Sequence, residues 1–232
     1  MPVDCKIRSL YREAKSKHTN CTTVKPNLDT EVAELLKNVI SESRLSHHPI
    51  VLEQPCQRIH GDVGPARAAH LDRTPIGANN YLHEKIPHED AVQLSKAGRT
   101  IVNVWRPLKA VKRDPLAICD GNTPQPGNLM PIQMDYSSNA RAKALGEEKG
   151  LNKTVRWEIT MDKYNDGQKW YYLFDMGEDE ALLMRIFHSD LAGGLDEGRV
   201  AVHSSFETKD GDVRESIEFR CFVFWPNEPL KS

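Results

Sequence analysis

The chain has 232 residues, of which 39% are hydrophobic and 28% are charged, so it can fold around a sizeable core. Its formal net charge is −2 with both signs interspersed, which gives no electrostatic reason to expect a nucleic acid or a membrane surface as a partner. The N-terminus lacks the apolar stretch of a signal peptide, no segment approaches the length of a membrane span, and the five cysteines form no Cys-x-x-Cys pair. We therefore expect one cytoplasmic domain over residues 1–232, with reduced thiols; these properties indicate no particular oligomeric state.

The N-terminal third should contain a polar segment, one clear helix and then short strands. Residues 1–28 are polar and of mixed charge, and we expect them to be loosely ordered. Residues 29–44 are expected to form a helix, because their apolar residues recur at helical spacing on one face. Short β segments are expected next at 49–54, 57–63 and 66–72, the last ending before a turn at Thr-Pro-Ile-Gly, and a second helix over 88–97 that Gly98 closes.

The rest of the chain is predominantly β in pattern. Strands are expected at 99–108, where Pro107 stops the strand, and at 116–120. Residues 121–152, rich in Pro, Gly, Asn and charge, are expected to form a long loop. The remaining segments are a strand pair around a Tyr-Asn-Asp-Gly turn (154–161 and 168–174), a strand or helix (181–187) and two strong strands (198–207 and 213–225). The expected fold class is mainly β with a few flanking helices, as a two-sheet antiparallel sandwich or jelly roll.

Three side chains suggest a metal site. In a strand, residues two apart point to the same face, so His70 and Asp72 should converge while Leu71 turns away. Such a pair is either a surface hydrogen bond or two-thirds of a metal site. Among the nine histidines, His203 lies in the middle of a strand-like segment. Together the three residues would form the two-histidine, one-carboxylate triad that is typical of non-haem Fe(II) oxygenases.

Arg214 and Ser216 supply a second chemical signal eleven residues after His203. On one strand face, a guanidinium and a hydroxyl two residues apart are well suited to bind a carboxylate. An Fe(II) oxygenase that uses 2-oxoglutarate needs such an anchor for the far carboxylate of the keto acid. The alternative is that Arg214 pairs with a neighbouring glutamate on an exposed edge, a contact worth about 0–1 kcal/mol.

Several blocks of the sequence resemble a known family. Between about residues 67 and 225 these blocks are HLDRTPIGA, IVNVWRPLKAVKRDPLAICDG, KWYYLFDMGEDEALLMRIFHS, AVHSSFE and RESIEFRCFVF. They are similar to the fungal AsaB-type hydroxylase/desaturase family, which is grouped with gibberellin-desaturase-like and CmcJ-like enzymes. The resemblance implies a double-stranded β-helix (jelly roll), Fe(II), 2-oxoglutarate and O2. It also implies that the metal ligands are His70, Asp72 and His203 and that Arg214 is the keto-acid anchor.

The predicted activity is hydroxylation, desaturation or oxidative cyclisation of a small molecule in secondary metabolite biosynthesis. Arg106, at the end of the Asn-Val-Trp-Arg-Pro block, is a candidate substrate-binding residue, or alternatively a residue that fixes a loop. Tyr171 and Tyr172 point to opposite faces, so at most one lines the pocket, and Tyr172 is the candidate. Because only 69 residues precede His70, a diverged, non-catalytic small-molecule binder or accessory subunit remains the alternative function.

Overall fold

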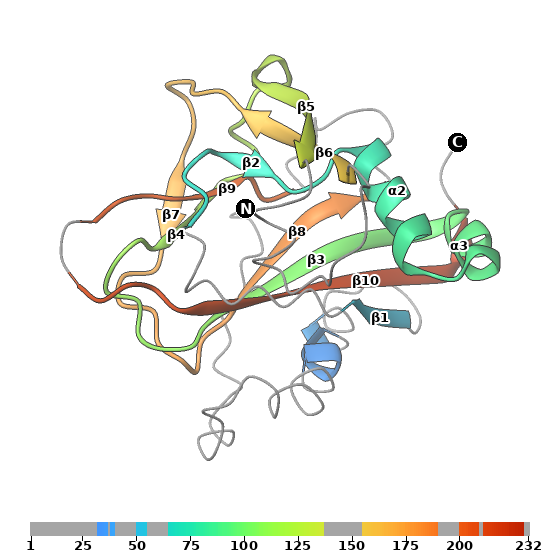
Figure 1. Cartoon of the computed structure of the whole chain (residues 1–232), viewed down its shortest axis with the longest axis horizontal. Helices are drawn as coiled ribbons and strands as arrows, with labels where there is room; N and C mark the ends of the chain where they lie inside the picture. The colour runs from blue at the N-terminus through green and yellow to red at the C-terminus, as the bar shows by residue number, and fades with distance from the viewer. Residues whose placement is uncertain are drawn as a thin grey trace.

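The computed structural model describes residues 32–36, 38–39, 50–54, 65–136, 155–189, 200–208 and 211–229. A helical stretch at 32–36 and 38–39 comes first. The labelled elements, in chain order, are β1 (Ile50–Gln54), β2 (His70–Leu71), α2 (Pro75–Lys85), α3 (His88–Leu94), β3 (Ala97–Pro107), β4 (Leu116–Cys119), the 3-10 helix η1 (Pro126–Asn128), β5 (Leu129–Tyr136), β6 (Val155–Asp162), β7 (Trp170–Tyr172), β8 (Leu182–His188), β9 (His203–Ser205) and β10 (Ser216–Pro229) (Figure 1).

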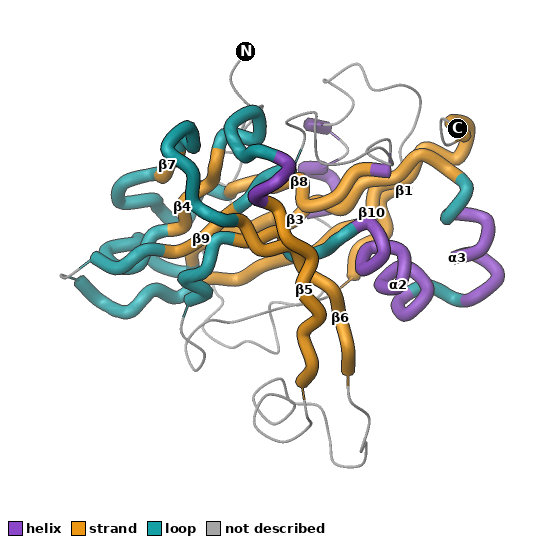
Figure 2. The backbone as a smooth tube through the Cα atoms, turned by 90° about the horizontal axis from the view of Figure 1, so that it is seen from above, coloured by secondary structure: helices purple, strands orange, loops and turns teal. Residues whose placement is uncertain are grey.

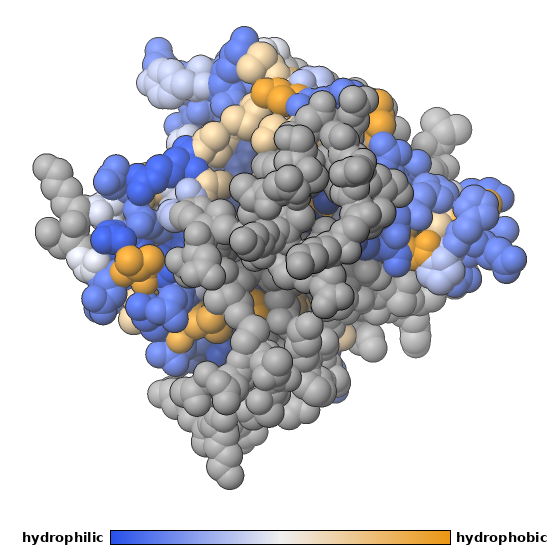
Figure 3. All heavy atoms as spheres, in the orientation of Figure 1, coloured by the Kyte–Doolittle hydropathy of each residue, from blue (hydrophilic) through white to orange (hydrophobic). Residues whose placement is uncertain are grey.

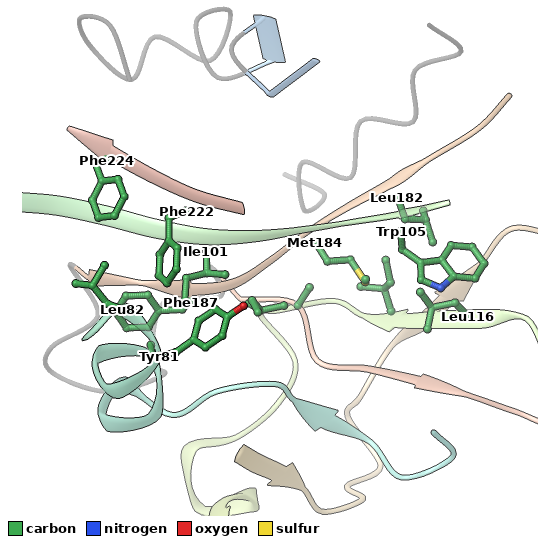
Figure 4. Packing of buried hydrophobic residues seen from close by; sticks show 14 of the residues in the cluster. Tyr81, Leu82, Ile101, Trp105, Leu116, Leu182, Met184, Phe187, Phe222 and Phe224 are labelled. Atoms are coloured by element: carbon green, nitrogen blue, oxygen red, sulfur yellow. The ribbon is translucent and has the colours of Figure 1, made fainter. Parts of the chain in front are cut away.

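The strands form two antiparallel sheets that face each other. One sheet has the order β1-β10-β3-β8 and the other has the order β5-β6-β2-β9-β4-β7. The main core lies between them, because its buried residues come from both sheets. Figure 4 shows these side chains, with Trp105 of β3 near Leu116 of β4 at one end and Phe222 near Tyr81 of α2 at the other. We call the face that each sheet turns toward the other its inner face. The expected class, mainly β with a jelly-roll architecture, is confirmed.

The outer face of the four-stranded sheet has a core of its own. Along β10, odd-numbered residues from Ile217 to Trp225 pack outward with Val32, Leu35 and Leu36 of the N-terminal helical stretch. This packing confirms the helix expected in 29–44 for its described residues. Even-numbered residues of β10 point inward, and near the start of the strand they are polar: Ser216, Glu218 and Arg220. Polar side chains on the inner face of a buried strand mark this region of the interior as a site rather than as core.

The predicted turn at Thr-Pro-Ile-Gly is instead the start of a helix. Thr74 is the N-cap of α2: its hydroxyl accepts a hydrogen bond from the Gly77 N–H at 3.0 Å. Pro75 occupies the first helical position, where its missing N–H costs nothing. The helix then buries Tyr81 and Leu82 against the core between the sheets. Figure 2 shows α2 and α3 side by side at one end of the sheets.

Other expected boundaries are also corrected. The helix expected at 88–97 ends as α3 at Leu94, and Gly98 lies inside β3 rather than closing the helix. The loop expected at 121–152 begins with turns at 121–125 and then contains η1 and β5, and its part from 137 to 152 lies outside the described residues, as do residues 1–28 and 57–63. The segments 154–161 and 168–174 do form strands, β6 and β7, but not a pair, because β6 pairs with β5 and β2 whereas β7 pairs with β4. For residues 181–187 the sequence did not decide between strand and helix, and the structure has a strand there, β8.

The surface seen in Figure 3 is mostly hydrophilic over the described residues, with small, separate hydrophobic areas. Among the described residues, no helix combines the length and the hydrophobicity that crossing a membrane requires.

Candidate metal centre

The three predicted ligands, His70, Asp72 and His203, meet on the inner face of the six-stranded sheet. One ligand atom from each of the three residues lies within 4.8 Å of the other two, a spacing at which one metal ion could bind all three. β2 pairs with β9 so that His70 lies directly opposite His203, and their ring centroids are 4.5 Å apart. Asp72 follows β2 by one residue, and Leu71 turns to the opposite face, where it is fully buried.

Both histidines present the same ring nitrogen to this cluster. His70 Nδ1 lies 2.8 Å from the backbone oxygen of Ala68, and His203 Nδ1 lies 3.0 Å from that of Ala201. A carbonyl oxygen can only accept, so each Nδ1 carries the proton and donates it. In the neutral form of each ring, Nε2 then has a free lone pair, which is the form that binds a metal ion.

The Asp72 carboxylate is held through one oxygen. Its Oδ2 accepts hydrogen bonds from Asn103 Nδ2 at 2.5 Å and from Arg220 Nη2 at 2.9 Å. Arg220 also donates to Asn103 Oδ1 at 3.1 Å and to Glu218 Oε1 at 3.0 Å, so it is clamped in place. The other carboxylate oxygen, Oδ1, lies 3.6 Å from His70 Nε2. Oδ1 therefore faces His70 Nε2, and both atoms could bind the same metal ion.

The electrostatics favour the metal-binding protonation state of Asp72 and His203. Burial alone would raise the pKa of Asp72, but Arg220 and the two histidines outweigh it and hold that pKa well below its usual value. Burial lowers the pKa of His203 to about 4, assisted by the neighbouring His70. For His70, burial acts to lower the pKa, yet the adjacent Asp72 carboxylate leaves it raised. At neutral pH, His203 is therefore neutral and Asp72 is charged.

Ser216 is the first residue of β10 and Arg214 lies two residues before it, close to the metal cluster. Arg214 Nη1 donates to Asp114 O at 2.6 Å and to Ser205 Oγ at 3.2 Å, and Ser205 is two residues from His203 on the same strand face. The guanidinium also lies 5.2 Å from the centre of the Trp105 ring. Arg214 is thus buried rather than paired with a glutamate on an exposed edge. Its Nε and the Ser216 Oγ are buried without a hydrogen-bond partner, and burial lowers the Arg214 pKa to about 10.

The two candidate substrate residues, Arg106 and Tyr172, do not join this cluster. Arg106 follows Trp105 on β3 and so points to the outer face, where its Nε donates to Glu178 O at 2.9 Å. Its alternative role of fixing a loop agrees with this contact. Tyr172 pairs with Ala117, whereas Tyr171 pairs with Ile118, the partner of His203. The inner-face residue is therefore Tyr171, and Tyr172 instead packs edge-on against Phe206 on the outer face.

Sequence reasoning missed Arg220 and Asn103 as supports of Asp72. A signal was present, because Ser216, Glu218 and Arg220 alternate with apolar residues in a strand that should be buried. Asn103, likewise, is a fully buried amide in β3. Buried polar residues at alternate positions predict a hydrogen-bonded network on one face of a strand.

Two histidines and one carboxylate on the inner face of a jelly roll define the class of mononuclear enzymes with a facial triad, typified by the non-haem Fe(II) oxygenases. Comparison with known proteins leads to the same class. A family described as an oxidoreductase/YMDC permease-like domain matches residues 8–224. The solved structure of the iron and alpha-ketoglutarate-dependent endoperoxidase NvfI superposes with a TM-score of 0.65 at 28% identity, covering 88% of this chain and 70% of that one.

Three curated relatives identify the family more closely. The hydroxylase/desaturase efuI of Hormonema carpetanum is 32% identical over 230 residues, which is 89% of this chain and 72% of the relative. The hydroxylase/desaturase CTB9 of Cercospora beticola is 32% identical over 85% of this chain and 63% of its own length. The hydroxylase/desaturase asaB of Aspergillus flavus is 38% identical over 65% of this chain and 66% of its own length. The chain belongs to this fungal hydroxylase/desaturase family, as the sequence resemblance indicated.

Proposed function

We propose that this chain is an Fe(II)- and 2-oxoglutarate-dependent oxygenase that hydroxylates, desaturates or oxidatively cyclises a small molecule in secondary metabolite biosynthesis. The observation that carries the proposal is the convergence of His70, Asp72 and His203 within 4.8 Å. Family membership supports it, because one curated relative in Aspergillus novofumigatus is named an Fe(II)/2-oxoglutarate-dependent dioxygenase. The chain spans 64% of that relative, so activity and substrate are inferred here from the site itself.

The donor set suits ferrous iron. Two neutral imidazoles and one carboxylate would bind one face of an octahedral ion and leave the remaining positions open to 2-oxoglutarate and O2. The orientation of each donor is fixed by the backbone oxygens behind the histidines and by Asn103 and Arg220 behind Asp72. Such supporting contacts keep ligands in place before the metal arrives.

Arg214 and Ser216, which together we call the keto-acid cradle, suit the far carboxylate of 2-oxoglutarate. Buried hydrogen-bond donors without acceptors are rare in native proteins. Arg214 Nε and Ser216 Oγ are two such groups, and they belong to residues only two positions apart in the sequence. A carboxylate would accept hydrogen bonds from both groups and would restore the charge balance of the buried guanidinium. Ser205 and the Trp105 ring hold that guanidinium from two sides.

When bound, iron with 2-oxoglutarate and O2 would supply the oxidation of a substrate C–H bond, with succinate and CO2 as co-products. The protein's own part is to bind, orient and exclude water. His70, Asp72 and His203 would hold the ion, and Arg214 would fix the orientation of the keto acid. Buried apolar side chains from both sheets, among them Trp105 and Leu116, surround this region and keep it dry.

The cytoplasmic location expected from the sequence is part of the same proposal. Cys119 and Cys221 are buried cysteines, and a reducing compartment keeps thiols and ferrous iron in their reduced forms.

The proposal is tested by adding Fe(II) and then 2-oxoglutarate under anaerobic conditions and recording visible absorption. A chelate gives a weak charge-transfer band, and admitting air should release succinate. We expect His203→Ala and His70→Ala to abolish both signals, and the exposed-residue control His83→Ala to keep them. Succinate formation that persists in the Asp72→Ala/His203→Ala double variant would refute the assignment. If the wild-type protein shows neither the absorption band nor succinate, the alternative of a non-catalytic small-molecule binder is favoured.

A further inference from the structure

The inner face of the six-stranded sheet continues beyond the metal ligands as an apolar stripe. Directly paired residues share a face, and His70 pairs with Met161, which in turn pairs with Met130. The next inward-facing pairs of β5 and β6 complete the stripe. Its members, all apolar and all partly exposed, are Met130, Ile132, Met134, Trp157, Ile159 and Met161.

The residues of this stripe are not part of the main hydrophobic core. The main core cluster within the described residues includes residues of β3, β4, β8 and β10 but none of these six. Methionine and tryptophan side chains form adaptable apolar walls, and here they start beside a metal ligand and run along β6 toward the beginning of α2. An apolar wall in this place suits the hydrocarbon skeleton of a substrate.

Arg73 supplies one charged group beside the stripe. It follows Asp72 directly, and its guanidinium lies 4.4 Å from the centre of the Tyr81 ring. Figure 4 shows Tyr81 reaching from α2 into the space between the sheets. The Arg220 guanidinium lies over the same ring at 5.8 Å and is bonded to Asp72, so Arg73 is close to the metal cluster.

Unlike Arg220, which donates to the Asp72 carboxylate, Arg73 donates no hydrogen bond to an acceptor within the part of the chain that the structure describes. Its Nε is buried without a hydrogen-bond partner, and among the described residues no carboxylate lies within ion-pair distance of it. A buried N–H without an acceptor is a costly arrangement, and a carboxylate on a ligand would supply the acceptor that Arg73 Nε lacks.

We propose that Arg73 and the β5–β6 stripe together bind the substrate, which is an apolar small molecule carrying a carboxylate. The planar guanidinium pairs with a carboxylate in two parallel hydrogen bonds, and the one guanidinium beside the stripe matches a single negative charge. The stripe packs against the hydrocarbon part. The inference rests on the proposed function, since it assigns the substrate class of that same site.

The test uses a matched pair of probes, decanoate and decan-1-ol, and isothermal titration calorimetry of the full chain. Metal is omitted because a metal ion would itself bind a carboxylate. The wild type should bind decanoate at least about tenfold more tightly than decan-1-ol, which corresponds to about 1.4 kcal/mol. Arg73→Gln should abolish this preference while decan-1-ol binding stays unchanged. Ile159→Asp should weaken the binding of both probes.

Arg106→Gln is the control, since its side chain lies on the outer face and should not affect the preference. Arg214→Gln shows whether decanoate occupies the keto-acid cradle instead. The proposal is overturned if Arg73→Gln still prefers decanoate, or if only Arg214→Gln loses that preference. It is also overturned if the wild type shows no preference for decanoate. Because Arg73 makes no hydrogen bond among the described residues, its variant should melt within about 3 °C of the wild type.

These measurements are independent of the proposed function. Loss of the Fe(II)–2-oxoglutarate band in the wild type would refute the oxygenase while leaving an Arg73-dependent preference for the acid intact. The opposite result, a normal band without the preference, would refute the substrate class alone.

Discussion

The Arg220 guanidinium and the Asp72 carboxylate form a partly buried ion pair at 2.9 Å, although the two residues are 148 positions apart in the sequence. β10 brings Arg220 to the inner face of one sheet, and the bend after β2 brings Asp72 to the inner face of the other. The pair therefore joins the two sheets at the candidate metal centre. It holds Oδ2 of the carboxylate and leaves Oδ1 for a metal ion.

Arg220→Met should weaken metal binding by about tenfold to a hundredfold, because contacts behind a ligand set its orientation. It should also lower the free energy of unfolding by about 3 kcal/mol, since Asp72 and Glu218 would lose their buried counterion. Co(II) titration followed by visible absorption and urea unfolding measure the two effects. Arg220→Lys should be intermediate in both, and Arg106→Met should bind Co(II) normally. Wild-type Co(II) affinity in Arg220→Met would show that the ion pair does not position the ligand.

Ser216→Ala should raise the dissociation constant for 2-oxoglutarate about tenfold without destabilising the protein. The Ser216 hydroxyl is buried and has no partner among the described residues, so its removal costs no internal hydrogen bond. Titration of the Fe(II)-loaded protein with 2-oxoglutarate measures the constant. Ser204→Ala is the matched control, since that hydroxyl donates to Arg67 O instead. An unchanged constant in Ser216→Ala would remove this hydroxyl from the cradle.

Gly77→Ala should destabilise the protein by about 1–3 kcal/mol, even though alanine favours helices. A Cβ at position 77 would lie 2.5 Å from the backbone oxygen of Glu158, so α2 would have to move away from β6. Thermal unfolding checks the prediction. At Gly127 an added Cβ meets nothing within 4 Å, and Gly127→Ala should stay within about 0.5 kcal/mol of the wild type. Equal stability of both variants would mean that α2 does not pack closely on β6.

Asp162→Asn should stabilise the protein at pH 7 by about 1 kcal/mol, after discounting for solvent screening. Burial raises the pKa of Asp162 to about 6 from 3.8, so ionising the carboxylate costs folding free energy as the pH rises through that window. The benefit should therefore vanish below about pH 4. The amide oxygen of the variant side chain could still accept the bond that Gln168 Nε2 donates to the carboxylate at 2.6 Å. Urea unfolding from pH 4 to 7 measures the difference, with exposed Asp212→Asn as the control; a variant less stable than the wild type at pH 7 would contradict the prediction.

The sequence alone determined most of the strands and the membership of the candidate centre. Residue alternation places His70 and Asp72 on one face and Leu71 on the other, and this local rule holds in the structure. The same alternation around His203 turns Val202 away from the metal cluster, into the cluster that buries Leu71. Such features depend only on the two-residue period of a strand, which a sequence displays directly.

Tertiary structure decided which strands pair and which side chains face the site. β6 and β7 look like a hairpin in the sequence, yet they lie at different places in the six-stranded sheet. That register turns Tyr171 rather than Tyr172 inward and brings Arg220 to Asp72. Thr-Pro-Ile-Gly begins α2 because a core between two sheets accepts Tyr81 and Leu82. Long-range pairing is set by the burial of whole faces against one another, and no short window of sequence contains both partners.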